Sequence, residues 1–413
     1  MSFLDPHAEA QAVTDAVTAQ LKTMFPYEGR KHNLVLKDVR VGESGDVGDI
    51  RGQKQAKLKG RTWAAPLYAD LELQTKDGTV IDSVKDYKLL GLPRITNLLS
   101  YIVDGAETQI SHQWHLKAGA YARVKDNGEL TTQFNVSGAP GFSLDFSPET
   151  RRYTLGMDKS NVPLYPILRS VYGVSDDALE KTWGTPILEA NRTVGGDRHV
   201  AKLYKVIFDK MPVDQAEAVA GIRENFTNSK MYGDTNELTL GAPISEVSDD
   251  ALIRASSRLL KISRGEDAQD PRDALHFKDL WGIENYLPKR LSDMSTSIRR
   301  KIRNNLDRRE KVSEIVHRDI FDAPVKSFFR LALAEQSHQV NPIAMLSDQR
   351  KTTIMGPMGG VQNEHAISID DRLVDQSHLG FLDAIPSPEG SKTGITTFLP
   401  DRKSTRLNSS HAS

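Results

Sequence analysis

The stretch 62–80 reads TWAAPLYADLELQTKDGTV and sets the character of the amino-terminal part of the chain. Its apolar side chains fall on alternate positions: Leu67, Ala69, Leu71 and Leu73. A period of two residues is typical of a β-strand with one buried face. Asp77-Gly78 is a favoured pair for a tight turn, and a second apolar run begins at Val80. The stretch therefore predicts a β-hairpin.

The neighbouring residues predict further hairpins and an opening helix. Residues 101–110 hold two short apolar runs around the turn pair Asp104-Gly105, and residues 142–157 alternate apolar and polar side chains. Residues 8–25 instead place apolar side chains at helical spacing: Ala10, Val13, Val17, Leu21 and Met24. The first 160 residues are therefore expected to be rich in strands after one helix.

Beyond residue 160 the periodicity becomes helical. It is clearest at 291–306, where one face carries Leu291, Met294, Ile298, Ile302 and Leu306. Strands followed by helices, without an internal repeat, indicate an α+β fold rather than alternating βαβ units. A chain of 413 residues is expected to be multidomain, since single domains usually hold roughly 100 to 200 residues.

The composition excludes several classes of protein. With 38% hydrophobic and 26% charged residues and a mean hydropathy of -0.45, it is that of a soluble globular protein. No apolar run approaches the ~18 residues of a membrane helix, and the first residues lack the pattern of a secretory signal. We therefore expect no membrane association and a cytoplasmic location. The absence of cysteine excludes disulfides and thiolate zinc sites.

Two motifs that could carry chemistry are better explained as structure. Residues 42–49 are rich in glycine, but no Gly-Lys-Ser or Gly-Lys-Thr follows, which favours a flexible loop over a phosphate cradle. His112 and His115 have a helical metal-ligand spacing, yet they follow a predicted strand and lack an obvious third ligand. The sequence also lacks the Asp-x-Asp-Gly-Asp cluster of a two-metal nucleotidyl-transfer site. No catalytic residue is therefore assigned.

Two local basic clusters are candidates for nucleic-acid contact, because the chain as a whole is nearly neutral, with 54 Lys and Arg against 55 Asp and Glu. The first comprises Arg51, Lys54, Lys57, Lys59 and Arg61. The second comprises Arg299, Arg300, Lys301, Arg303, Arg308, Arg309 and Lys311. Neither has interleaved aromatic residues for stacking single-stranded bases. A solvated helix face and a contact with duplex or backbone phosphates are about equally favoured.

The segment 339–361 is polar, and its composition predicts a mobile loop. Its motifs are more specific. Asn341-Pro342, the basic pair Arg350-Lys351 and Gly356-Pro357 resemble, in order and spacing, the fork region of the beta subunit of multisubunit DNA-dependent RNA polymerases. Residues 377–380 and 385–390, SHLG and IPSPEG, resemble that family's Ser-His-Tyr-Gly and Ile-Glu-Thr-Pro-Glu-Gly signature. The chain therefore resembles the amino-terminal part of such a beta subunit.

The upstream half agrees with this resemblance. Residues 60–67, GRTWAAPL, are similar to the family's Thr-Tyr-Ala-Ala-Pro-Leu strand, and residues 101–110 are similar to its Phe-Val-Ile-Asn-Gly-Thr-Glu-Arg-Val-Ile hairpin. Asp273 and Lys278 resemble the Asp and the basic residue of its Asp-His-x-Gly-Asn-Lys/Arg stretch. The resemblance covers nearly all of residues 50–400. Its divergence, without large insertions, resembles that of a phage-encoded or otherwise fast-evolving polymerase.

The resemblance implies a set of named parts. A strand-rich protrusion-like domain with helices would comprise 20–116 and 283–334, an inserted lobe-like domain 117–282, and a loop-rich fork-like segment 335–400. Residues 401–413 resemble an extraneous tail. Together the named parts would form one wall of the DNA channel in transcription.

The resemblance also implies partners, a cofactor and site residues. The expected partners are a beta-prime-like subunit, the DNA template and the RNA–DNA hybrid, with alpha-like and sigma-like subunits as further candidates. Mg²⁺ in the assembled enzyme would be held by the partner subunit, so the fragment alone is expected to be inactive. The implied nucleic-acid-binding positions are Arg350, Lys351, Asp273, Lys278, Asn363 and His365.

Several positions lack a charged residue that is usual in the family: Thr108, Leu116, Asn363, His365 and Phe381. These losses keep a second interpretation open, a non-catalytic DNA-binding or interaction protein that reuses the beta-subunit fold. The segment also differs where rifamycins bind in the family. Asp348, His338 and Gln336 stand where the family has His, Asp and Phe, while Arg350 and Thr353 keep the expected chemistry, so rifamycin resistance is expected.

Overall fold

The computed structural model describes residues 5–42, 47–125, 127–157, 160–194, 196, 198–317, 319–331, 333–337, 341–356, 361, 363–367, 369 and 372–400. Residues 43–46 of the glycine-rich stretch, His338, residues 357–360 and the tail 401–413 therefore lie outside the described residues. The chain divides into two compact units. Unit 1 comprises Met1–His115 and Leu280–Ser413, and unit 2 comprises Leu116–Asp279.

Unit 1 contains a four-stranded antiparallel sheet. Its strands follow one another in chain order: β1 (Tyr27–Glu28), β2 (His32–Val41), β3 (Ala64–Thr75) and β4 (Val80–Pro93). The hairpin predicted at 62–80 is confirmed as β3 and β4, and the alternate residues from Leu67 to Leu73 are fully buried. A short helix, α2 (Ile50–Leu58), lies between β2 and β3 in the chain.

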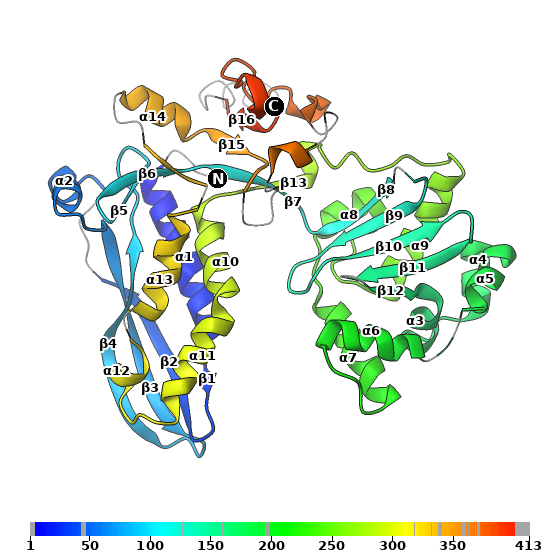
Figure 1. Ribbon diagram of the computed structural model, residues 1–413, viewed down its shortest axis with the longest axis horizontal. Coiled ribbons are helices and arrows are strands. Elements are labelled where there is room, and N and C mark those ends of the chain that lie inside the picture. The colour runs from blue at the N-terminus through cyan, green and yellow to red at the C-terminus, as the bar shows by residue number, and fades with distance from the viewer. Residues whose placement is uncertain are drawn as a thin grey trace. The chain divides into compact units, whose positions relative to one another are not determined.

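Helices from two distant parts of the sequence pack on this sheet (Figure 1). The predicted opening helix is confirmed as α1 (Pro6–Met24), which Asp5 caps by accepting hydrogen bonds from the amides of His7 and Ala8 at 3.0 and 3.3 Å. It packs beside α10 (Ile283–Asp293). Three more helices complete the layer: α11 (Ser295–Leu306), α12 (Val312–Ile315) and α13 (Asp319–Phe328). One apolar core therefore joins residues from two stretches of the chain that are far apart in the sequence.

The prediction of one continuous helix at 291–306 is wrong. The structure divides it at Met294, whose ψ of 1° interrupts the helical repeat between α10 and α11. The predicted apolar face is nevertheless correct, since Leu291, Ile298, Ile302 and Leu306 are buried and Met294 packs against the same core. The spacing of apolar residues indicates which face of a helix is buried, and one non-helical residue does not change that face.

Unit 2 packs helices on a five-stranded sheet, whose order is β12-β11-β10-β9-β8. The strands are β8 (Gly119–Val124), β9 (Leu130–Asn135), β10 (Phe142–Ser147), β11 (Arg152–Met157) and β12 (Ser160–Pro163). The helices are α3 (Leu164–Ser170), α4 (Asp176–Trp183), α5 (Thr185–Arg192), α6 (Arg198–Phe208), α7 (Gln215–Asn228), α8 (Gly233–Leu240) and α9 (Asp249–Ser263). All seven helices follow the strands in sequence, so the predicted α+β fold class is confirmed.

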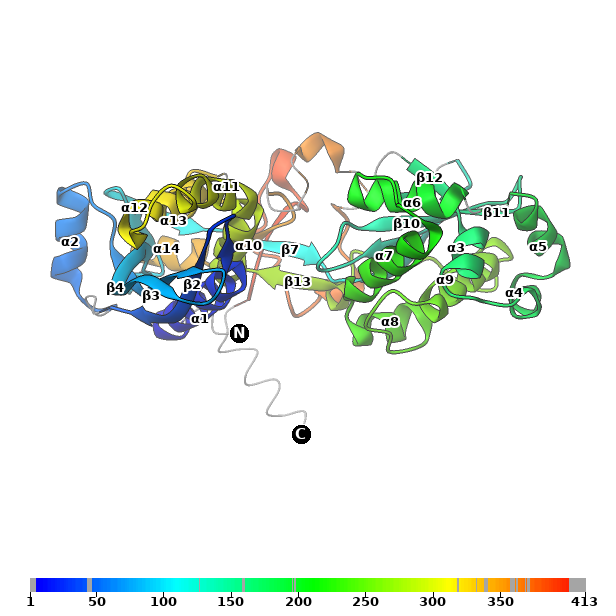
Figure 2. The ribbon, with the colours of Figure 1, turned by 90° about the horizontal axis from the view of Figure 1, so that it is seen from below.

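Two small sheets contain the strands of the carboxyl-terminal part of the chain together with earlier strands. The first has the order β14-β6-β5, with β5 (Tyr101–Val103), β6 (Ala106–Ile110) and β14 (Ala334–Gln336). The second has the order β13-β7-β15-β16, with β7 (His112–Leu116), β13 (Lys278–Trp281), β15 (Lys351–Thr353) and β16 (Thr396–Phe398). Figure 2 shows β7 and β13 side by side. Composition predicted a loop at 339–361, and the structure corrects this with α14 (Pro342–Asp348) and β15.

Candidate nucleic-acid interface

The segment 335–400 is attached to unit 1 by strand pairing. β14 pairs antiparallel with β6, so that Gln336 lies opposite Thr108. β15 pairs in parallel with β7, with Thr352 opposite His112, and β16 then pairs antiparallel with β15. The partners come from positions more than 200 residues apart in the sequence. Backbone hydrogen bonds to β6 and β7 therefore fix the position of the segment on unit 1.

Buried polar contacts reinforce this attachment. The hydroxyl of Thr352, which is fully buried, accepts a hydrogen bond from the Trp114 indole at 3.1 Å and lies 2.6 Å from the hydroxyl of Thr397. The Gln109 amide nitrogen donates to the carbonyl of Met345 at 2.7 Å. These hydrogen bonds hold the segment to β6 and β7 near its start and near its end. The loops of the segment therefore begin at positions that are fixed on unit 1.

Two of the motif residues have clear local roles. Asn341 caps α14 by accepting a hydrogen bond from the amide of Ile343 at 2.9 Å, and Pro342 occupies the first helical position that suits it. Gly356 lies against Gln113, which is fully buried, and a Cβ at 356 would come within 2.8 Å of the Gln113 Oε1 atom. The motif glycine thus permits a close approach to β7.

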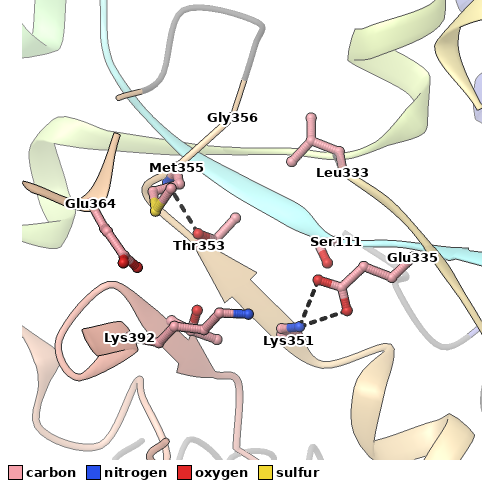
Figure 3. A pocket seen from close by; sticks show the side chains of 10 residues that line it. Ser111, Leu333, Glu335, Lys351, Thr353, Met355, Gly356, Glu364 and Lys392 are labelled. Atoms are coloured by element: carbon pink, nitrogen blue, oxygen red, sulfur yellow. Dashed lines mark hydrogen bonds and ion pairs between the residues drawn. The ribbon is translucent and has the colours of Figure 1, made fainter. Parts of the chain in front are cut away.

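A pocket of about 370 Å³ lies within the attached segment (Figure 3). Its walls come from the end of β6, the strands β14, β15 and β16, and the loops that follow them. The lining residues are Ser111, Leu333, Glu335, Lys351, Thr353, Met355, Gly356, Glu364, Lys392 and Thr396. Two lysines and two glutamates therefore line a mostly apolar hollow, so the pocket offers both signs of charge to a polar ligand.

The two expected fork cations have different surroundings. The Lys351 ammonium group donates hydrogen bonds to both carboxylate oxygens of Glu335 at 2.9 and 2.7 Å, and its side chain is only 18% exposed. Arg350 is half-buried, and its carbonyl accepts a hydrogen bond from the amide of Leu399 at 2.9 Å. No carboxylate of the described residues lies within ion-pair distance of its guanidinium. Arg350 is therefore the fork cation that can reach a phosphate without breaking an ion pair.

The other four expected site residues do not add to the positive charge of Arg350 and Lys351. Asn363 accepts a hydrogen bond from the amide of His365 at 3.0 Å, which caps a short 3-10 helix, and both residues are exposed. Asp273 and Lys278 belong to unit 2, where they form an ion pair of 3.3 Å with each other. The structure thus gathers Arg350 and Lys351 in unit 1 and places the Asp273–Lys278 pair in the other unit.

The described residues provide no protein-built site for a metal ion. No group of three His, Cys, Asp or Glu side chains in that part of the chain is placed to bind one. His112 and His115 lie on β7, and burial lowers the pKa of each to about 4. The His115 ring stacks on Trp281 with 3.8 Å between centroids. Their role in unit 1 is packing, and no catalytic step through Mg²⁺ is assigned to these residues.

Comparisons with known proteins agree with these observations. Residues 335–400 match the family model of RNA polymerase Rpb2, domain 3. Across 96% of its length the chain also aligns with the DNA-directed RNA polymerase subunit beta of Deinococcus radiodurans, at 24% identity over 457 aligned residues. The chain is therefore similar to the beta subunit of RNA polymerase. It spans 38% of the length of that relative.

The matched range contains the two expected fork cations and all the pocket-lining residues except Ser111 and Leu333. Its range, 335–400, is the range that the motifs assigned to the fork-like segment, so the resemblance drawn from Asn341, Arg350-Lys351 and Gly356 is confirmed. Sequence reasoning missed Glu335, the partner of Lys351, because the two residues are 16 positions apart and meet only through the pairing of β14 and β15 with β6 and β7. No helix of the described residues is long and apolar enough to cross a membrane.

Proposed function

We propose that the chain serves as part of the beta subunit of a multisubunit DNA-directed RNA polymerase and forms one wall of its DNA channel. The observation that carries this proposal is the Rpb2 domain 3 match at 335–400. The alignment of 96% of the chain with a bacterial beta subunit supports it across both units. The protrusion-like, lobe-like and fork-like assignments of 20–116 with 283–334, of 117–282 and of 335–400 are part of this proposal.

In this assembly the chemistry would belong to a partner. A beta-prime-like subunit would hold the Mg²⁺ ion that nucleotidyl transfer needs, and alpha-like and sigma-like subunits would complete the complex in the cytoplasm. The chain would supply sequence-independent contacts to the phosphates of the DNA template and of the RNA–DNA hybrid. This division of roles between the two subunits would explain why the motifs of this chain are those of a channel wall.

Arg350 would make the principal fork contact. Its guanidinium has no ion-pair partner among the described residues, whereas Lys351 already bonds Glu335. Arginine can bind a phosphate through two parallel hydrogen bonds, which suits a contact that must hold a strand in position. Asn363 and His365 would add hydrogen bonds, and Asp273 with Lys278 would add a weak contact, because their charges offset each other.

A second function is supported by the same ion pair. A non-catalytic DNA-binding or interaction protein could keep the beta-subunit fold while losing cations of the channel, as at Leu116, Asn363 and His365. The neutralisation of Lys351 by Glu335 is consistent with such a loss. The retained Gly356 and Arg350 favour the polymerase, because packing alone does not require an arginine that forms no ion pair with the described residues.

Purification of the chain from its source cell would test the two functions. We expect a large subunit carrying an Asp-x-Asp-Gly-Asp sequence to co-purify with the chain. We expect the complex to synthesise RNA on a template in the presence of Mg²⁺. The 413-residue chain alone should bind duplex DNA weakly and synthesise none. Arg350→Ala should slow the complex, and Lys392→Ala, which removes a cation from the lining of the pocket, serves as a control. Isolation of the chain without such a subunit would support the non-catalytic alternative.

A further inference from the structure

The second basic cluster is exposed on one side of α11 and the turn that follows it. The stretch 295–311 holds seven Lys and Arg against two acidic residues, whereas the chain as a whole has a net charge of -1. All seven cations are exposed: Arg299, Arg300, Lys301, Arg303, Arg308, Arg309 and Lys311. The opposite side of α11 is fixed in the core by Ile298, Ile302 and Leu306. The cations therefore cannot turn toward the protein without unpacking the helix.

A distant part of the sequence adds two cations to this cluster. The turn between β1 and β2 lies beside the end of α11, where the Asp307 carboxylate accepts hydrogen bonds from the amides of Arg30 and Lys31 at 2.8 and 2.9 Å. His32 Nδ1 lies 3.0 Å from the carbonyl of Leu306. Both Arg30 and Lys31 are exposed. Nine exposed cations thus gather at one end of unit 1.

The close approach of the turn depends on Gly29. A Cβ at this position would come within 2.7 Å of the Asp307 carboxylate and within 2.9 Å of the Leu306 side chain. One oxygen of the Asp307 carboxylate accepts the hydrogen bonds of both backbone amides, which lower the pKa of this group. The acidic residue inside the cluster therefore holds the backbone in place, and the positive side chains around it stay directed toward solvent.

Little of the positive charge is neutralised within the described part of the chain. Arg309 has a carboxylate partner, Glu314, at 3.3 Å, and both side chains are about half-exposed. No other member of the cluster forms an ion pair with a described residue. In the first basic cluster, Lys57 is likewise the member that forms an ion pair with a described residue, the buried Glu107. The cluster on α11 thus differs from an ordinary solvated helix face, on which opposite charges usually alternate.

We infer that the surface formed by Arg30, Lys31 and the cations of 299–311 binds the phosphate backbone of duplex DNA. Six of the nine cations are arginines, whose planar guanidinium groups match phosphate oxygens. The stretch 295–311 contains no aromatic residue, so stacking on single-stranded bases is disfavoured. The 12 residues of α11 extend roughly 18 Å, enough to meet several successive phosphates of a duplex.

This surface is separate from the fork-like segment. Figure 1 shows α11 beside β1, at the end of unit 1 away from β15 and β16. The surface therefore contacts DNA at a second place, remote from the pocket and from Arg350. The inference rests on the cluster itself and does not depend on the polymerase assignment.

Binding of the 413-residue chain to a labelled 30-base-pair duplex, measured by fluorescence anisotropy over a range of salt concentrations, tests this surface. The variant Arg299→Gln/Arg300→Gln/Arg303→Gln should weaken binding roughly 10- to 100-fold at low salt and make the plot of log K against log salt shallower by roughly 2 to 3. The pair Arg30→Gln/Lys31→Gln should also weaken binding, although these residues lie far away in the sequence. Far-ultraviolet circular dichroism checks that each variant is folded.

The first basic cluster supplies a matched control. Arg51→Gln/Lys54→Gln/Lys59→Gln removes the same charge from exposed positions on and beside α2, and it should leave the affinity within about twofold of the parent chain. Equal losses for the two triple variants, or none for the α11 variant, would overturn the inference. A parallel titration with poly-glutamate identifies the other possible partner. If the α11 variant weakens poly-glutamate binding more than DNA binding, the surface recognises an acidic protein.

Discussion

The core of unit 1 buries its apolar side chains between a sheet and a layer of helices, whereas residues 335–400 leave most of theirs in solvent. Ile302, Phe321 and Leu34 are fully buried in that core. In the segment, Met345, Ile367 and Ile395 are the large apolar side chains of the described residues that are buried. The exposed ones are Ile343, Leu346, Val361, Ile369, Leu373, Val374, Leu379, Phe381 and Ile385.

The difference shows that two parts of the same unit are ordered by different forces. The core is ordered by apolar burial, which is worth roughly 25 cal/mol per Å² removed from water. The segment is ordered by pairing with β6 and β7 and by buried threonines such as Thr352. Exposed apolar side chains at this density are typical of surfaces that another protein covers. Stability should therefore be sensitive to substitutions in the core, and binding should be sensitive to substitutions in the segment.

The largest effect is expected in the core, at Ile302. Ile302→Ala removes a fully buried side chain from α11 and should lower the free energy of unfolding by about 2 to 4 kcal/mol. Arg299→Ala on the exposed side of the same helix is the control and should change it by less than about 0.5 kcal/mol. Urea unfolding, with hydrogen exchange of the α11 amides, measures both. Equal losses for the two variants would contradict the assignment of the buried face.

In the segment, a comparable effect is expected on drug binding. A polymerase containing this chain should need roughly 100-fold more rifamycin for inhibition than a sensitive bacterial enzyme, because Asp348 and Gln336 replace expected binding partners at about 1 kcal/mol or more each. Transcription across a rifampicin titration measures this resistance. Asp348→His with Gln336→Phe should restore part of the sensitivity. Inhibition of the unchanged enzyme at the usual concentrations would show the register through Asn341 to Gly356 to be wrong.

A third prediction concerns pH and the carboxyl group of Glu9 in the first turn of α1. Burial, opposed by the hydrogen bond from Tyr101 and increased by the charge of Glu284, raises the pKa of Glu9 from 4.5 to about 7. Below pH 4.5 the carboxyl group is protonated in both the folded and the unfolded chain. As the pH rises toward 7, the unfolded chain ionises first, so the stability of unit 1 should fall by on the order of 2 to 3 kcal/mol.

Glu9→Gln separates this titration from other acidic groups. The neutral side chain can still accept the hydrogen bond of Tyr101, so the variant should match the parent near pH 4.5 and be the more stable one at pH 8. Urea unfolding at the two pH values gives the comparison. A parent and a variant that lose the same stability between them would show that Glu9 is ionised in the folded chain.

The smallest effect is expected at the ion pair of the segment. A double-mutant cycle on Lys351→Met and Glu335→Gln should give a coupling of about 0.2 to 1 kcal/mol, because Glu335 is half-exposed. Freed of its partner, Lys351 should then strengthen DNA binding by up to roughly fivefold in Glu335→Gln. Glu364→Gln removes the same charge from the same pocket without freeing Lys351, and it should strengthen DNA binding less. Equal changes for the two would show that Lys351 contributes nothing once released.

Much of this fold could be predicted from local sequence. The hairpin of β3 and β4 and the apolar face of α11 follow from periodicities of two and of about 3.6 residues, which neighbouring residues impose on each other. The break at Met294, and the helix α14 and strand β15 where a loop was expected, could not be predicted in this way. β15 exists because β7 supplies its hydrogen-bonding partner, from more than 200 residues earlier in the chain.

The sequence by itself determined the family resemblance, the buried faces and the positions of the two expected fork cations, Arg350 and Lys351. Only the tertiary structure decided which charges are available. It paired Lys351 with Glu335 and Asp273 with Lys278, and it brought Arg30 and Lys31 to the cations of α11 through Asp307. The physical reason is that a residue's type fixes its charge, whereas the strength of an electrostatic interaction depends on distance and on exclusion of water. Both are set by the path of the whole chain.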